Sequence, residues 1–492
     1  MTLRARAVEQ PPSALLEPAG DDRPPQARRL RGLLVALDQG RAGTLFAAMG
    51  LGLAYAALAT VVTVISPFVN AASTAASFWP AAGLTSAALL SSPYRRWPWF
   101  LLTIFLVEAG IDRLMLGVSM GASLGWALAN TIEPLVGAVL VRRLIGTRLD
   151  LARRDHLFAF LVCAVGVGPL VGATIGSLTN DVTGTGGFIE TVGRWLIGDG
   201  VGVLVLAPAL LTAFQPGPKA ARGGLILVAL ICLSAFAPAS LGFPGLPLPY
   251  LAMPVVVWLA IVGRTAVASR TVLLLAIIVD GATIAGVGPF AERGAYDGLL
   301  SAQFFLAVTG ISALLVASLA SELLTRDAVE ARLRIQATHD ALTGLPNREL
   351  LLSRLDEAAR AGRPVSLGFV DLNDFKDIND SLGHHVGDRV LQLVADRLSS
   401  RVRAGDLLAR IGGDEFAVLL AGEDPAGVVD RLLDALLEPF VVGDEVLHVS
   451  ASIGLASSHD GTGVDDLLRR ADLAMYEAKR NGKGRQALFE AM

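Results

Sequence analysis

Cysteine and charge are both scarce in this chain of 492 residues. The two cysteines, Cys163 and Cys232, each lie inside an apolar run, where a thiol packs as a small hydrophobic group, so we expect no disulfide framework. Charged residues make up 17% of the chain and the formal net charge is −4. This composition has no polybasic signature, so we expect no nucleic-acid partner.

The amino-terminal segment lacks a sustained apolar core. Residues 1–43 are rich in Pro, Arg and Ala, which argues against a cleaved signal peptide. A segment of this composition has too little apolar surface to form a packed core. We therefore predict that residues 1–43 are a disordered cytoplasmic tail.

Hydrophobic residues are abundant instead, at 53% of the chain, and the mean hydropathy is +0.56. Charges are sparse from residue 43 to residue 319 and dense from residue 322 onward, which indicates a membrane domain followed by a soluble one. Because a hydrocarbon core about 30 Å thick needs roughly 20 apolar residues per helix, we predict eight to ten transmembrane helices over residues 44–321. The ten candidate spans are 44–67, 75–92, 98–118, 120–142, 156–178, 190–214, 223–242, 247–263, 266–290 and 299–321.

Basic residues are concentrated in alternate loops between these spans. Lys and Arg in short loops stay on the cytoplasmic side of a membrane. With the amino terminus inside and an even number of spans, both termini lie in the cytoplasm, and we expect a multi-pass protein of a bacterial inner (plasma) membrane. The residues on the inner side are Arg95, Arg96, Arg142, Arg143, Arg148, Arg153, Arg154, Lys219, Arg222, Arg264 and Arg270.

Several acidic residues fall inside the predicted spans. Ionisable groups at membrane depth are costly and usually face the bundle interior or water, so they indicate a ligand or ion site. The alternatives are structural pairing, for example of Asp112 or Glu108 with Arg113, or a position nearer the membrane interface, and all of these interpretations stay open. The residues are Glu108, Asp112, Glu133, Asp199 and Asp280.

The segment 322–338 contains neither Gly nor Pro and is rich in helix formers, so we predict a helix that continues the last span as a signalling linker. Its apolar residues form a narrow seam that fits a parallel dimer. A solvated connecting helix is the alternative. The seam residues are Leu323, Leu324, Val329, Leu333 and Ile335.

Residues 339–492 alternate helix and strand patterns, as in an α/β or α+β sandwich. An apolar run over 365–370 predicts a strand that ends at Asp371, and residues 407–420 predict a β-hairpin with Asp414 and Glu415 at its tip. If these strands are neighbours, three carboxylates converge, which suits Mg²⁺ bound together with substrate phosphates. The glycines beside Asp414 let a nucleotide approach the backbone closely. For the hairpin alone, a plain turn with two solvated acids is the alternative.

Three short motifs lie in the apolar half: FWPAAGL at 78–84, NTIE at 130–133 and WLIGD at 195–199. With them, residues 44–322 resemble the MASE1 family of integral-membrane sensory domains. The resemblance implies a sensor whose ligand is unknown. A plain membrane anchor is the alternative, and a transporter is disfavoured because we find no clear internal repeat.

The soluble half carries DALTGLPNR at 340–348, DLNDFKDINDSLGHHVGD at 371–388, GGDEF at 412–416, ASIGL at 451–455 and ADLAMYEAK at 471–479. With these motifs, residues 338–484 resemble the GGDEF family. The resemblance implies a fold like that of adenylyl cyclases and polymerase palms. It also implies a diguanylate cyclase, which condenses two GTP into cyclic di-GMP and pyrophosphate and acts as a homodimer.

The resemblance also implies roles for matching residues. It implies metal ligands at Asp371, the Leu372 carbonyl and Asp414, for Mg²⁺ or alternatively Mn²⁺. Catalytic roles fall to Asp414, Glu415 and Lys376, with Glu415 assisting activation of the ribose 3′-hydroxyl. Asn379 and Asp388 would read the guanine, His384 would line the site, and the lysines would hold phosphates. The full substrate-binding set is Asn379, His384, Asp388, Gly412, Gly413, Lys479 and Lys483.

Arg403 and Asp406 match the RxxD inhibitory site of this family, five residues before GGDEF. Because Arg binds guanine edges and phosphates by paired hydrogen bonds, we expect the product cyclic di-GMP to bind there. The alternative function is a catalytically silent GGDEF domain that acts as a receptor for cyclic di-GMP or GTP. A phosphodiesterase is not expected, since no hydrolase domain follows before Met492.

Overall fold

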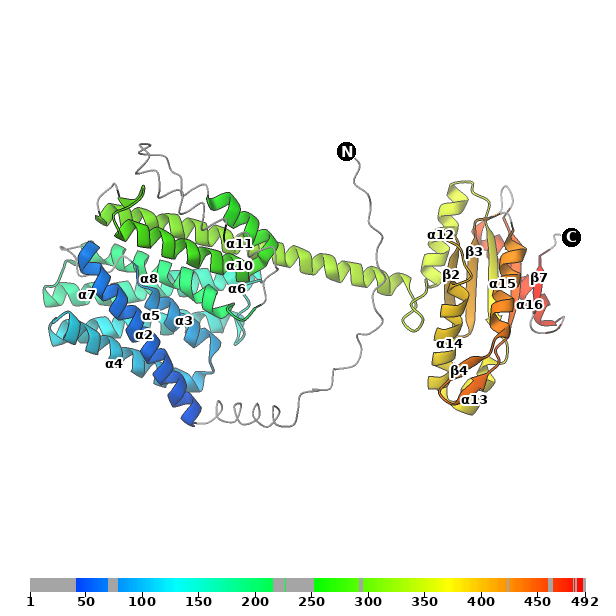
Figure 1. The fold of residues 1–492 in the computed structure, drawn as a ribbon, viewed down its shortest axis with the longest axis horizontal. Helices are drawn as coiled ribbons and strands as arrows, with labels where there is room; N and C mark the ends of the chain where they lie inside the picture. The colour runs from blue at the N-terminus through cyan, green and yellow to red at the C-terminus, as the bar shows by residue number, and fades with distance from the viewer. Residues whose placement is uncertain are drawn as a thin grey trace. The chain divides into compact units, whose positions relative to one another are not determined.

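The computed structural model forms two compact units that divide between Thr325 and Arg326, and each unit is described by itself (Figure 1). The predicted tail over 1–43 lies outside the described residues except at its end, where the first helix begins at Arg41. The predicted span 223–242 lies outside them as well, apart from residue 226. The structure describes residues 41–69, 78–215, 226, 252–291, 295–422, 424–458, 463–480, 482 and 485–489.

Helices are the regular secondary structure of the membrane unit in its described part, and short turns and loops connect them. Its short helices are α3 (Pro80–Ser91), η1 (Tyr94–Arg96) and α6 (Arg154–Ala159), and α6 continues through the π-helix η2 (Phe160–Val167) into α7 (Gly168–Thr183). The other helices are α2 (Arg41–Val69), α4 (Trp97–Met115), α5 (Met120–Ile145), α8 (Phe188–Leu211), α10 (Ala252–Ile284) and α11 (Ala295–Thr338).

Six stretches among the described helices are long and apolar enough to cross a membrane. Two predicted spans are not among these six: α3 has 12 residues and rises only about 18 Å, and α4 carries Glu108, Asp112 and Arg113. The predicted spans 247–263 and 266–290 both lie largely in α10, which bends sharply at Arg264 (φ 57°, ψ −161°). The six stretches are Gly43–Val64, Met120–Ile145, Arg154–Thr183, Phe188–Leu211, Ala252–Ile284 and Asp297–Thr338.

Helix α8 connects the two hydrophobic clusters of this unit. Its residues Leu204 and Ala207 pack in a cluster with α2, α3, α4 and α5, whereas Val201 and Val205 pack in a second cluster with α10 and α11. Glycines allow α8 to approach α3 closely, because a Cβ at Gly83 would lie 2.3 Å from the carbonyl oxygen of Gly202. A change in the position of α8 therefore affects both clusters.

The second unit is built on a five-stranded sheet of order β2-β3-β1-β6-β7, in which β6 and β7 are parallel and the other neighbours antiparallel. This architecture, together with the helical membrane unit, confirms the predicted fold class. The strands are β1 (Ser366–Leu372), β2 (Leu407–Gly412), β3 (Glu415–Leu420), β6 (Ala451–Ser457) and β7 (Gln486–Leu488), with a separate hairpin of β4 (Phe440–Val442) and β5 (Glu445–Leu447).

Helices cover both faces of the sheet (Figure 1). Because side chains alternate along a strand, Val370 and Leu372 of β1 pack toward α14 and α15, whereas Leu367 and Phe369 pack toward α12 and α16. Asp371 is two residues after Phe369, so its side chain points to the same face of the sheet, toward α12 and α16. The helices are α12 (Arg348–Arg360), α13 (Phe375–Leu382), α14 (His384–Ser399), α15 (Pro425–Leu437) and α16 (Val464–Arg480).

Helix α11 has 44 residues and contains the whole segment 322–338. A turn closed by Asp340 follows it, because the Asp340 carboxylate accepts hydrogen bonds from the Thr343 backbone N–H (2.9 Å) and hydroxyl (2.7 Å). Nη1 of Arg410, on β2, donates to the same carboxylate oxygen at 2.8 Å. Burial acts to raise the pKa of Asp340, but the bonds from Thr343 and Arg410 outweigh it and hold the pKa below its ordinary value.

Removing the charge at Asp340 should destabilise the second unit. The side chains of Arg410 and Asp340 are only 10% and 25% exposed, so we expect Asp340→Asn to cost roughly 1.5–3 kcal/mol of unfolding free energy at pH 7. Because the pKa of Asp340 is lowered, its stabilisation is present above about pH 4 and is lost as the pH falls through the lowered value. Wild type and variant should therefore converge in acid.

The measurement is urea unfolding of fragment 326–492 at several pH values. Asp327→Asn is the matched control, since Asp327 is exposed on α11. A stability difference for Asp340→Asn that is the same at pH 3 and pH 7 would contradict the assignment.

Candidate active site

The acidic residues of the predicted metal site come from neighbouring strands. Asp371, near the end of β1, is directly opposite Glu415, the first residue of β3. Asp414 lies in the turn just before β3, and its carbonyl oxygen accepts a hydrogen bond from the Leu372 N–H at 3.2 Å. The structure thus brings Asp371, Leu372, Asp414 and Glu415 together at one end of the neighbouring strands β1 and β3.

The hairpin tip is a two-residue turn, since Gly412 pairs with Glu415 across Gly413 and Asp414. Gly413 has φ +53°, a left-handed conformation that glycine adopts without steric cost. Arg410 donates to the Gly413 carbonyl oxygen from Nε at 3.1 Å and from Nη2 at 2.8 Å. One guanidinium therefore holds both the hairpin tip and the Asp340 turn.

Arg410 was not among the predicted site residues. Its sequence signal is a single basic residue in an otherwise apolar strand, two positions before the Gly pair. Asn373 was missed as well, although it directly follows the Leu372 carbonyl. It is buried, its Nδ2 donates to Ser450 Oγ at 3.0 Å, and its Oδ1 accepts from Ser452 Oγ at 2.8 Å. These hydrogen bonds position the backbone at the carboxyl-terminal end of β1, where the predicted metal ligands lie.

Lys479 reaches the carboxylates from α16, with its Nζ 2.6 Å from Oδ2 of Asp371. Here the ammonium group neutralises a carboxylate, although the sequence predicted a phosphate contact. Lys376 is exposed in the first turn of α13. Lys483 lies outside the described residues.

The predicted guanine-reading residues lie where α13 meets α14. Gly383 joins the two helices with φ +87°. A Cβ at Gly387 would lie 1.9 Å from Oδ1 of Asn379, so the glycine makes room for the Asn379 amide beside α14. Asp388, the next residue, is exposed, as is His384 at the start of α14. The structure therefore gathers Asn379, His384 and Asp388 around one helix junction.

The donor set suits a hard cation. Mg²⁺ is typically held by one or two carboxylates together with substrate phosphates and water. Asp371, Asp414 and the Leu372 carbonyl provide such a set. Within the described ranges, no group of three or more His, Cys, Asp or Glu side chains is arranged to hold a metal ion by itself. These residues therefore fit Mg²⁺ that is bound jointly with phosphate oxygens.

Arg403 and Asp406 lie in the tight turn between α14 and β2, where Gly405 has φ +113°. Oδ1 of Asp406 accepts a hydrogen bond from the Ala421 N–H at 3.0 Å, while the Arg403 side chain is exposed. The turn is at the start of β2 and the GGDEF turn at its end, so roughly 17 Å of strand separates them.

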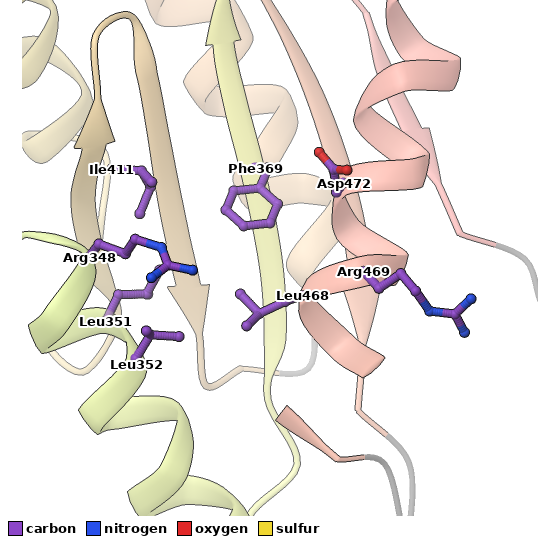
Figure 2. A pocket seen from close by; sticks show the side chains of 8 residues that line it. All are labelled: Arg348, Leu351, Leu352, Phe369, Ile411, Leu468, Arg469 and Asp472. Carbon is purple, nitrogen blue, oxygen red and sulfur yellow. The ribbon is translucent and has the colours of Figure 1, made fainter. Parts of the chain in front are cut away.

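A pocket of about 270 Å³ opens between α12 and α16, on the same face of the sheet as Asp371 (Figure 2). Figure 2 shows Arg348 reaching over the apolar floor and Arg469 pointing away from it. None of the predicted site residues lines this pocket. Its lining residues are Arg348, Leu351, Leu352, Phe369, Ile411, Leu468, Arg469 and Asp472.

Comparison with known proteins gives matches to both halves. The bifunctional diguanylate cyclase/cyclic di-GMP phosphodiesterase MucR of Pseudomonas aeruginosa is 40% identical over 220 residues, which are 41% of this chain and 32% of MucR. The diguanylate cyclase TpbB of Pseudomonas aeruginosa is 42% identical over 171 residues, which are 32% of this chain and 39% of TpbB. The chain thus spans about a third of the length of MucR and about two-fifths of that of TpbB.

Among solved structures, the coiled coil and GGDEF domain of DgcB from Caulobacter crescentus, in complex with cyclic di-GMP, is 29% identical. The match covers 35% of this chain and 96% of that one, with a TM-score of 0.33. Residues 44–324, more than half of the chain, match the MASE1 family, and residues 337–485 match the family described as diguanylate cyclase, GGDEF domain. The chain belongs to the MASE1 family of integral-membrane proteins and carries a GGDEF domain behind its membrane domain.

Proposed function

We propose that the protein is a membrane-bound diguanylate cyclase that condenses two GTP into cyclic di-GMP and pyrophosphate under the control of its MASE1 domain. The observation that carries this proposal is that Asp371, the Leu372 backbone and Asp414 lie together at one end of β1 and β3. The Nζ of Lys479 is 2.6 Å from Oδ2 of Asp371. Two carboxylates, a main-chain carbonyl and an ammonium group are what a metal–triphosphate requires.

In this mechanism Asp371, Asp414 and the Leu372 carbonyl hold Mg²⁺. When bound, the ion neutralises charge on the phosphates of GTP. Asn379 and Asp388 bind the guanine edge, and Lys479 and Lys376 hold phosphate oxygens. Glu415 accepts the proton of the ribose 3′-hydroxyl. The 3′-oxygen then bonds to the α-phosphorus of the second GTP, whose bond to the pyrophosphate oxygen breaks, and the step repeats in the opposite direction.

Each active site holds one GTP, so catalysis needs two chains that face each other. The apolar seam on α11 supports a homodimer, because its side chains are about half exposed in the single chain. Exposed Leu, Val and Ile along one linker helix favour association with a second such helix. The seam consists of Leu323, Leu324, Val329, Leu333 and Ile335.

Loss of a metal carboxylate should abolish turnover and leave the fold intact. Asp414→Asn and Asp371→Asn keep side-chain volume but remove the charge opposite the phosphates, so we expect the rate to fall by about 100-fold or more. The assay is chromatographic detection of cyclic di-GMP formed from GTP and Mg²⁺ by the full-length protein in detergent. Asp444→Asn, an exposed acid between β4 and β5, is the control.

Ordinary turnover in either variant would refute the metal assignment. A wild-type protein that binds GTP or cyclic di-GMP tightly without turnover would favour the receptor function instead.

The membrane topology is the second testable part of the proposal. Because basic residues are retained inside, we propose that both termini and the GGDEF domain are cytoplasmic. Alkaline phosphatase fused after Met492 should be inactive, and the same enzyme fused after Gly117, between α4 and α5, should be active. Activity of the Met492 fusion would mean that the number of crossings is odd.

Product feedback is the third testable part of the proposal. Arg403 is exposed at the far end of β2 from the catalytic turn, so it is free to bind a cyclic di-GMP without touching substrate. We expect Arg403→Ala to keep the initial rate of the wild type and to escape inhibition by micromolar cyclic di-GMP in progress curves. Arg401→Ala, two residues away and also exposed, should stay inhibited. Equal inhibition of wild type and Arg403→Ala would assign Arg403 no role in feedback.

A further inference from the structure

The three sequence motifs of the membrane domain meet at one place. The Trp79 N–H donates to the Gly198 carbonyl oxygen at 3.2 Å, which joins FWPAAGL on α3 to WLIGD on α8. Glu133, of the NTIE motif on α5, is the acidic neighbour of Asp199 on α8. A Cβ at Gly172 of α7 would lie 2.7 Å from Oε2 of Glu133, so this glycine leaves the space that the carboxyl group fills.

The acidic groups at this place are buried but incompletely paired. Glu133 is 1% exposed and Asp199 3%. Both carboxyl oxygens of Glu133 and Oδ2 of Asp199 have no hydrogen-bond partner among the described residues. An unpaired carboxylate in a water-free interior is very costly. The burial therefore requires a positive charge that stays with the pair.

A non-acidic side chain on another helix adds an independent sign of an incomplete site. Tyr55 of α2 is 1% exposed, lies beside Glu108, and its hydroxyl has no described hydrogen-bond partner. Glu108 accepts a hydrogen bond from Asn130 Nδ2 through one oxygen, and its other oxygen is unpaired. Buried acceptors thus extend from the Glu133–Asp199 pair toward α4 and α2.

The pair lies at mid-membrane depth. Glu133 and Asp199 are each at least 11 residues from both ends of their helices, which is about 16 Å along a helix axis. A hydrocarbon core is about 30 Å thick, so both carboxyl groups lie near its centre. Bulk water does not neutralise them there.

We propose that Glu133 and Asp199 form a cation-binding site in the membrane domain and that its occupant is a proton shared between the two carboxyl groups. Two adjacent carboxyl groups that share one proton carry a single charge and hydrogen-bond each other. A metal ion fits less well, because no acidic group of three or more in the described chain is arranged to hold one. The close Gly172 wall favours the smallest cation.

Among the described residues, no cation is recorded beside this pair. Helix α2 contributes the Tyr55 hydroxyl and α4 contributes Glu108, next to which Asp112 lies. Helix α8 adds the Trp195 side chain beside Asp199. Helix α7 contributes Gly172, which has no side chain. Loss of the shared proton would leave two like charges side by side and push α5 and α8 apart.

The site is connected to the output helix by direct packing. Leu204 lies little more than one turn after Asp199 on α8, and its Cδ2 would be 3.2 Å from a Cβ at Gly310 of α11. Helix α11 continues without interruption to Thr338, just before the Asp340 turn. A shift of α8 on deprotonation is therefore transmitted to the helix that leads into the GGDEF domain.

The test is infrared spectroscopy of the purified full-length protein in detergent at pH 7. The spectrum of wild type minus Glu133→Gln should contain a protonated-carboxyl C=O band, because the amide keeps the volume and removes the acid. Asp199→Asn should lose the same band. Glu190→Gln, an exposed acid at the start of α8, is the control and should leave the band unchanged.

In a second arm, raising the pH should remove the band reversibly. Over the same pH range, the cyclase activity of the wild type should change, whereas that of Glu133→Gln should be insensitive to pH. Wild-type and variant spectra that are identical in the carboxyl region would overturn the proposal, and so would a band that disappears on addition of Na⁺ or Mg²⁺ at constant pH. The infrared arm does not depend on turnover, so a failure of the proposed cyclase function would be seen separately.

Discussion

The antiparallel pairing of β1 with β3 is the constraint on which the candidate active site depends. Its register sets Asp371 opposite Glu415, and alternation along β1 buries Val370 and Leu372 on the opposite face from Asp371. A slip of one residue would turn Val370 and Leu372 toward α12 and α16 and bury the carboxylate in the core beneath α14 and α15. The hydrophobic core and the candidate metal ligands are thus fixed by the same register, and the folding free energy of the sheet holds the candidate site in place.

Arg410 extends this constraint to the turn that follows α11. Its guanidinium bonds both the Asp340 carboxylate and the Gly413 carbonyl oxygen, so the turn that follows α11 and the turn that carries Asp414 share one partner. Hydrogen bonds of a charged group in a largely buried position are strong and directional. A displacement of the Asp340 turn therefore alters the hairpin tip that carries Asp414.

Within the membrane domain the corresponding constraint is the cost of burying carboxyl groups. Gly83 and Gly202 let α3 and α8 approach closely, Gly172 makes room for the Glu133 carboxyl group, and Glu133 and Asp199 are both buried. Helices that approach through glycines have little freedom to separate gradually, so a change of charge between them favours two discrete arrangements. Because α8 belongs to both hydrophobic clusters, such a change involves the packing of α10 and α11 as well.

The sequence by itself determined the division into an apolar and a charged half, the strand that carries Asp371 near its end, the hairpin over 407–420 and the helix through 322–338, because each depends on local periodicity and turn residues. It overestimated α3 as a full span, since composition alone does not reveal where an apolar helix ends. Only the tertiary structure decided that Lys479 forms an ion pair with Asp371 and that Glu133 is next to Asp199. It also decided that Arg410 and Asn373 position the turns around the candidate site. These contacts join segments tens to more than a hundred residues apart, and which strands and helices become neighbours is set by the packing of the whole core rather than by local sequence.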